Sequence, residues 1–232
     1  MKDSNTLFLH QEVMLLALRD DKGTIEAGSM YQYAIGGAII AELLLNERIT
    51  IEKIRRKDLV TLQNSRPMGD SLLDQCLTKI ANAKRRAIAQ TWVSKFANTK
   101  NLKHIIANEL CKKGILKADE DKVLLIFSRK IYPEINPVPE QKLIERLRNA
   151  IFTDTIDIDP RTVVLLSLAH NSGLLRANFN KKELKSGKKR IGKIVKGEIA
   201  GKATKQAIDA MQTAVMVACM MPAITSATMV SH

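Results

Sequence analysis

The segment Tyr33–Leu45 constrains the fold of this chain more than any other. Its interior carries one charged residue, Glu42, and has apolar side chains on nearly every side. A helix that is apolar all round must be covered on several faces, so this one is expected in the centre of a helical bundle. Small residues at Gly36, Gly37 and Ala38 would let a neighbouring helix approach closely. A second apolar segment, Ala210–Met221, predicts a buried helix, because it is too short to span the roughly 30 Å hydrocarbon core of a bilayer.

The remaining pattern predicts amphipathic helices and little sheet. Hydrophobic periodicity and capping residues place the further helices at about residues 6–18, 71–83, 84–96, 102–113, 139–152, 160–170 and 203–221. One β-hairpin is expected, with a strand at Ile115–Lys117, a polar turn at Asp119–Asp121 and a second strand at Val123–Phe127. A short strand is expected at Arg48–Glu52. The predicted fold class is mainly α, with central apolar helices surrounded by amphipathic helices in a single domain over residues 1–232, plus one β-hairpin.

Net charge and cysteine content limit the classes of partner and the cellular compartments that fit this chain. A net charge of +13 favours nucleic acid, an anionic membrane or an acidic protein as the partner. The three cysteines are far apart and odd in number, which indicates a reducing compartment without a disulfide framework. The first residues lack the charged-then-apolar pattern of a signal peptide. The sequence therefore predicts a cytoplasmic protein whose membrane contact, if it has one, is peripheral.

No catalytic or metal-binding arrangement stands out. The four histidines are scattered, and none forms a metal-ligand spacing with a cysteine. The sequence has no nucleophile elbow, and Gly36-Gly37 does not follow a strand as in a phosphate-binding loop. Asp154, Asp157 and Asp159 alternate before a predicted helix, where capping and solvation account for them. We therefore expect a protein that is not an enzyme and that uses no cofactor and no metal ion.

Two basic features could bind an anion. Lys100 and Lys103 are three residues apart at the start of a predicted helix, whose free N–H groups and dipole favour a phosphate. The second feature is the basic run between Lys181 and Lys205, in which glycines weaken a continuous helix. A flexible basic run is attracted to anionic lipid at about 1 kcal/mol per residue, and nucleic acid would attract it as well. The residues expected to contact anionic membrane are Lys181, Lys182, Lys185, Lys188, Lys189 and Arg190.

Five segments, in order along the chain, carry a family resemblance. They are Glu12–Asp20, Gly37–Leu43, Pro67–Asp74, Lys113–Leu116 and Asp159–Thr162. With these segments the chain resembles the Golgi phosphoprotein 3 family, helical proteins that bind phosphatidylinositol 4-phosphate on membranes.

The resemblance implies a head-group pocket. The family's two basic residues that lie three apart fall on Lys100 and Lys103, as lysine rather than arginine. The family's pocket arginine falls on Gly36, and Tyr31 and Tyr33 stand where its pocket tryptophan is expected. Lysine lacks the bidentate fork of arginine, so a weaker grip on the head group is expected.

The resemblance also implies partners and a location. Self-association is expected through the hairpin region Val123–Tyr132, and glycosyltransferase tails are possible partners. Coatomer is not expected, because the N-terminal arm that binds it in eukaryotic members is essentially absent here, as in the prokaryotic branch. A eukaryotic member would lie on the cytosolic face of the Golgi. The leading hypothesis is thus a peripheral membrane-binding adaptor for a phosphoinositide-type head group. The alternatives are a nucleic-acid binder with a winged helix at Leu102–Phe127 and a protein–protein scaffold without a lipid role.

Overall fold

The computed structural model describes residues 6–19, 22–25, 30–123 and 127–199. The predicted helix at 203–221, with its apolar part Ala210–Met221, lies outside these residues. The described helices are α1 (Leu9–Ala17), α2 (Tyr31–Leu45), α3 (Ser71–Ala81), α4 (Ala89–Ala97), α5 (Leu102–Lys112), α6 (Val138–Phe152), α7 (Pro160–Asn171), α8 (Leu175–Asn178) and α9 (Lys181–Val195). The described strands are β1 (Ile49–Ile54), β2 (Lys57–Leu62), β3 (Asp119–Val123) and β4 (Phe127–Ile131).

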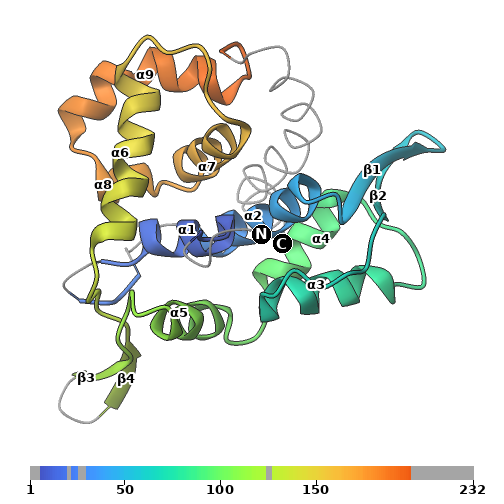
Figure 1. Ribbon diagram of the computed structural model, residues 1–232, viewed down its shortest axis with the longest axis horizontal. Coiled ribbons are helices and arrows are strands. Elements are labelled where there is room, and N and C mark those ends of the chain that lie inside the picture. The colour runs from blue at the N-terminus through green and yellow to red at the C-terminus, as the bar shows by residue number, and fades with distance from the viewer. Residues whose placement is uncertain (1–5, 20–21, 26–29, 124–126, 200–232) are drawn as a thin grey trace, which may run out of the picture.

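Helices α1 and α2 lie in the middle of the molecule. Helices α6, α7 and α9 gather on one side of them, and α3, α4 and α5 lie on the other (Figure 1). All residues of α1 and the stretch from Ala34 to Leu43 in α2 are buried, and they belong to one hydrophobic core to which most other elements contribute. The mainly α fold and the central position of α2 are therefore confirmed.

Gly36 has a packing role in this centre. A Cβ atom on Gly36 would lie 2.5 Å from the carbonyl oxygen of Val93 in α4. Since α2 and α4 pack against each other along this line, only a glycine allows their backbones to come this close. The expectation that small residues in α2 admit a neighbouring helix is confirmed at this position.

A buried ion network ties the two central helices to α7. Glu42 is fully buried, and its two carboxylate oxygens lie 2.9 and 3.1 Å from Nη1 of Arg161. The same carboxylate accepts the backbone N–H of Leu9 at 2.7 Å. Glu12 in α1 joins through Arg146 of α6 at 3.0 Å and through Nε of Arg161 at 3.5 Å. Charged residues of three of the resembling segments thus meet in the core.

Asp70 performs a similar task at the start of α3. Its carboxylate accepts the backbone N–H of Leu73 at 2.9 Å and the side-chain amide of Gln11 at 3.2 Å, and it lies 3.4 Å from Nε2 of His10. Burial alone would raise the pKa of Asp70, but the contacts with His10 and with backbone amides hold it below its usual value. This carboxylate caps α3 and fastens it to α1.

The sheet content differs from the prediction in two ways. The strand expected near Ile49 has a partner, β2, and the two form an antiparallel hairpin that the sequence analysis missed. Its turn places Arg55 and Arg56 at φ values of 46° and 67°, a region that arginine rarely adopts. Because two arginines occupy this turn, it lacks the Asn-Gly or Asp-Gly signature by which a hairpin is recognised in a sequence, and the hairpin was missed for that reason.

The expected hairpin exists, but its predicted register is wrong. The acidic residues Asp119–Asp121, predicted to form the turn, lie in strand β3. Val123, predicted to begin the second strand, ends β3 and pairs with Phe127 at the start of β4. The two ends of the predicted strand Val123–Phe127 therefore belong to different strands of the hairpin that projects beside α5 (Figure 1).

Two helix predictions also need correction. Residues 84–88 are not helical, because Ala87 and Ile88 run beside β2, where the carbonyl of Ala87 accepts the N–H of Val60 at 2.9 Å. The first part of the basic run Lys181–Lys205, expected to be flexible, forms the continuous helix α9 over Lys181–Val195, and its residues from 200 on lie outside the described part of the chain. A capping box between Asn180 and Glu183 fixes its start, and Gly187 packs against Ile151 instead of interrupting the helix.

Candidate anion-binding site

Lys103 lies in the first turn of α5, directly after a sharp turn of the backbone that precedes the helix. Asn101 precedes the helix with a left-handed backbone (φ 58°), and the N–H of Leu102 bonds to the carbonyl of Thr99. Helix α5 therefore begins at Leu102, and Lys100 lies outside it in a turn. The argument that Lys100 and Lys103 share a helix face is wrong, because the left-handed residue between them breaks the helical spacing.

The surroundings of Lys103 favour an anion. Its side chain is half-buried, with Nζ 5.6 Å from the ring centroid of Tyr132. Burial, followed by the nearby positive charge of Arg129, lowers the pKa of Lys103. Within the described part of the chain, Lys103 has no carboxylate partner to offset this. A bound anion would restore the favourable environment that the ammonium group lacks.

Tyr132 organises the side chains around Lys103. Its ring is 1% exposed, and its hydroxyl lies 2.8 Å from Nδ1 of His104. Its backbone N–H bonds to the carbonyl of Gly23 at 3.0 Å, where a Cβ on the glycine would collide with the Tyr132 backbone. The loop after α1, the base of the β3–β4 hairpin and the start of α5 are therefore held together at Tyr132.

Further positive charge comes from β4. Burial, with Lys103 and Lys130, lowers the pKa of His104. Arg129 is engaged by Asp121 on the neighbouring strand at 2.7 Å, and Lys130 stands opposite Glu120 in the strand register. We refer to Lys103, His104, Arg129 and Lys130 as the α5 basic cluster. Lys103 is its member closest to the helix N-terminus, where backbone N–H groups are free of intrahelical bonds.

The other predicted head-group residues do not all join this cluster. Lys100 is exposed in the turn two residues before α5. Tyr31 and Tyr33 lie in the first turn of α2 and pack partly against the core, and burial raises the pKa of Tyr31. The residue before them, Met30, bonds to the carbonyl of Ser172 at the end of α7. Gly36 is buried against α4, so no side chain at this position could reach a ligand without separating the two helices.

Helix α9 arranges the second predicted set. Lys181, Lys182, Lys185, Lys188 and Lys189 are exposed. Arg190 is not available in the same way, because its Nε donates to the carbonyl of Ala150 at 2.7 Å and its Nη2 donates to the carbonyl of Thr155. It binds carbonyls at the end of α6 and in the following loop, which gives Arg190 a structural role, while membrane contact by these basic residues stays a prediction.

Sequence reasoning missed His104, Arg129, Lys130 and Tyr132 as members of the site. His104 is adjacent to Lys103, but no spacing pattern singles it out. The other three follow Phe127, where the second strand of the hairpin was predicted to end, so they were not considered as site residues. A recognisable signal was the alternation from Phe127 to Ile131, which places Arg129 on one face of a short strand.

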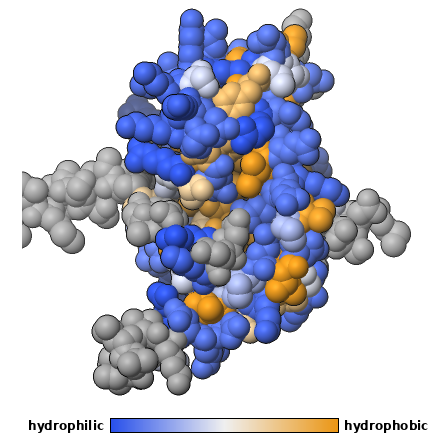
Figure 2. Space-filling model, turned by 90° about the vertical axis from the view of Figure 1, so that its left-hand side faces the viewer, coloured by the Kyte–Doolittle hydropathy of each residue, from blue (hydrophilic) through white to orange (hydrophobic). Residues whose placement is uncertain are grey.

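The molecular surface is mainly hydrophilic on the face that lies at the left of Figure 1. Figure 2 shows the left-hand face of Figure 1, where hydrophobic side chains form separated patches rather than one continuous area. None of the described helices is long and apolar enough to cross a membrane.

These features define a mainly helical protein built around two buried helices and a buried ion network, with basic helix surfaces and projecting hairpins. The family comparison agrees with this class. The chain belongs to the Golgi phosphoprotein 3 (GPP34) family, whose model matches residues 9–211. The match includes the α5 basic cluster, helix α9 and all five segments on which the resemblance rested.

Proposed function

We propose that this chain is a peripheral membrane-binding adaptor that recognises a phosphorylated lipid head group at the α5 basic cluster. The observation that carries the proposal is Lys103: a half-buried ammonium group at a helix start, with an adjacent guanidinium and no carboxylate partner among the described residues. A phosphate there would accept hydrogen bonds from backbone N–H groups and would be attracted both by the helix dipole and by the lysine charge. Membership in the GPP34 family supports phosphatidylinositol 4-phosphate as the first lipid to test.

The geometry favours phosphate binding over phosphate chemistry. The cluster offers cations and a buried phenol, whereas Asp121 on the neighbouring strand is engaged by Arg129. A tight grip by two arginine forks is not available, since one cation is a lysine and the arginine is shared. We therefore expect modest affinity, with membrane residence helped by other basic surfaces of the protein.

The test compares Lys103→Gln with Lys113→Gln, an exposed lysine at the opposite end of the same helix. Binding is measured by co-sedimentation with phosphatidylcholine vesicles that carry either phosphatidylinositol 4-phosphate or phosphatidylserine at equal total charge. At about 0.15 M salt, Lys103→Gln should remove the preference for the phosphoinositide vesicles, because partly buried contacts are screened less than exposed ones. Lys113→Gln should keep that preference. An unchanged preference in Lys103→Gln would show that the head group binds elsewhere.

A further inference from the structure

Helix α9 presents one wide, uninterrupted face of positive charge. Its buried positions Gly187, Ile191 and Ile194 follow helical spacing and face the α6–α7 side of the core. The opposite arc holds exposed lysines, and its continuation past the helix end adds Lys196. The acidic residue within the helix, Glu183, is engaged by Arg148 at 2.5 Å and by the capping box. Within α9 itself the exposed arc therefore carries lysines without a carboxylate, and the exposed Glu198 stands just past its end.

Gly192 lies in the middle of this lysine arc, where packing does not require a glycine. A Cβ atom there would meet nothing within 4 Å, whereas at Gly187 it would approach Ile151 to 2.5 Å. A glycine inside a helix costs about 0.5–1 kcal/mol relative to alanine. Gly192 thus weakens α9 without any gain in helix packing.

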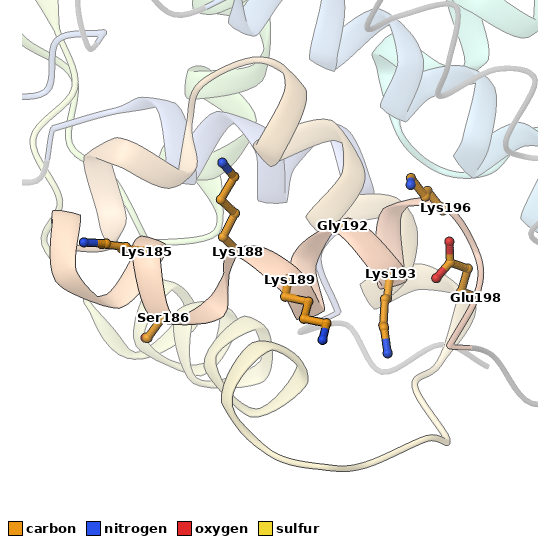
Figure 3. A pocket seen from close by; sticks show the side chains of 8 residues that line it. All are labelled: Lys185, Ser186, Lys188, Lys189, Gly192, Lys193, Lys196 and Glu198. Atoms are coloured by element: carbon orange, nitrogen blue, oxygen red, sulfur yellow. The ribbon is translucent and has the colours of Figure 1, made fainter.

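Gly192 lines a shallow depression on the surface. The depression has a volume of about 600 Å³ and is lined by Lys185, Ser186, Lys188, Lys189, Gly192, Lys193, Lys196 and Glu198. Lys188, Lys189 and Lys196 stand four before, three before and four after the glycine, so they are its direct neighbours on the helix surface. Figure 3 shows the lysine side chains fanning out around Gly192. The depression is therefore surrounded by lysines, with the Glu198 carboxylate at one edge, and its surface charge favours an anion.

Exposed apolar side chains accompany the lysine arc. Phe152, at the end of α6, is 38% exposed and would lie 3.2 Å from a Cβ on Gly187. Ile156 is 75% exposed and follows Thr155, whose carbonyl is held by Arg190 of α9. A lysine-rich helix face with apolar side chains beside it is typical of a surface that lies in a membrane interface. Single-stranded nucleic acid is instead bound by stacking successive bases on several aromatic rings, whereas beside this arc Phe179 is buried and Phe152 is the exposed ring among the described residues.

We propose that the lysine face of α9 is a second membrane-contact surface, and that the depression at Gly192 receives the phosphate of an anionic lipid. Helix α9 and the β3–β4 hairpin beside α5 lie at opposite edges of the molecule (Figure 1). The α9 surface is therefore independent of the α5 basic cluster and shares no residue with it. It requires only an anionic phospholipid, not a phosphoinositide.

The first test separates this surface from net charge. The variant Lys188→Gln, Lys189→Gln, Lys196→Gln is compared with the control Lys53→Gln, Lys57→Gln, Lys79→Gln, in which three exposed lysines elsewhere are neutralised. The probe is a vesicle of four parts phosphatidylcholine and one part phosphatidylserine, without phosphoinositide, at about 0.15 M salt. The α9 variant should bind roughly 100-fold more weakly than the parent, and the control should stay within a few-fold. Equal losses in both variants, or no loss in the α9 variant, overturn the proposal.

The second test addresses the depression and the type of partner. Gly192→Gln keeps every lysine and fills the gap with a neutral helix-forming residue, so it should weaken vesicle binding several-fold while thermal unfolding shows an intact fold. Binding equal to the parent would show that the gap holds no phosphate. Ile156→Ser should weaken vesicle binding and leave binding to a single-stranded oligonucleotide unchanged. If the α9 lysine variant loses the oligonucleotide but keeps the vesicle, the surface binds nucleic acid and the membrane assignment is wrong.

These outcomes are distinguishable from a failure of the α5 proposal. Lys103→Gln should behave as the parent on phosphatidylserine vesicles, and the α9 variant should keep its relative preference for phosphoinositide vesicles. Loss of both properties in either variant would mean that the two surfaces act as one, which contradicts the inference.

Discussion

Gly36→Ala and Gly192→Ala are the same substitution in two helices, and the structure predicts that one destabilises the fold and the other stabilises it. At Gly36 the new Cβ would lie 2.5 Å from the Val93 carbonyl oxygen and 3.3 Å from the Ala97 nitrogen. Both are backbone atoms of α4, so no side-chain rotation relieves the collision. At Gly192 the Cβ enters open space.

The expected magnitudes follow from two opposing effects. Overpacking a well-packed interior costs about 1–3 kcal/mol, whereas replacing a helical glycine by alanine gains about 0.5–1 kcal/mol. Gly36→Ala should therefore lower the free energy of unfolding by about 1–2 kcal/mol, because α2 and α4 must separate. Gly192→Ala should raise it by about 0.5–1 kcal/mol. For a chain of this size these changes correspond to a Tm roughly 2–8 °C lower and roughly 1–4 °C higher, respectively.

The assay is thermal unfolding followed by circular dichroism, with urea unfolding as a second measure. A Gly36→Ala variant as stable as the parent would refute the close contact between α2 and α4. The same contact predicts that Gly36→Arg, which restores the family's pocket arginine, should destabilise the fold rather than strengthen lipid binding. A stable Gly36→Arg protein with improved phosphoinositide binding would refute the structural role that we assign to this glycine.

Three further predictions concern the core, the histidines and the hairpin. Arg161→Met removes the guanidinium from the fully buried Glu42 and should lower the free energy of unfolding, measured in urea, by about 3–5 kcal/mol. The control Arg86→Met breaks the exposed pair with Glu52 and should lower it by at most about 1 kcal/mol. Similar losses in the two variants would contradict a buried network. The pKa values of His104 and His170 are lowered in the folded protein, so as pH falls the unfolded chain binds protons before the folded one does. The free energy of unfolding should therefore decrease as pH drops below the unfolded pKa of about 6.5 and through the lower folded values. The double variant His104→Asn, His170→Asn should flatten this slope between neutral and mildly acidic pH, and an unchanged slope would assign it to other groups. Replacing residues 121–129 by a short Gly-Ser turn, with the buried Tyr132 retained, should reduce the mass measured by sedimentation if the hairpin mediates self-association, and an unchanged mass would argue against that role.

The charged residues of the resembling segments show how far the sequence alone reaches. Glu12, Glu42, Asp70 and Arg161 belong to the five segments by which the family was identified, and the structure places all four in ion pairs or hydrogen bonds within the fold. A buried ion pair requires both partners and a defined geometry, so such residues leave a recognisable pattern even when they bind nothing outside the protein. They identify the fold but do not indicate the ligand.

Local signals determined most of the helices. Asp159 before Pro160 marked the start of α7, and the structure shows its carboxylate accepting the N–H of Thr162. The apolar surface of the Tyr33–Leu45 segment placed α2 in the centre, because a helix without a polar face has no stable position at the surface. Each of these inferences depends on neighbouring residues in the chain, which is why the sequence was sufficient.

The sequence singled out Lys103, but only the tertiary structure shows which residues surround it in the candidate site. Lys103, His104, Arg129 and Tyr132 come from α5 and from the end of a hairpin, and nothing in their spacing shows that they meet. Gly187 and Gly192 look alike in the sequence, yet one lies against Ile151 and the other leaves open space. Whether a glycine interrupts a helix, packs against a neighbour or opens a surface depends on what lies opposite it. That is settled by the packing of distant segments and not by the residue itself.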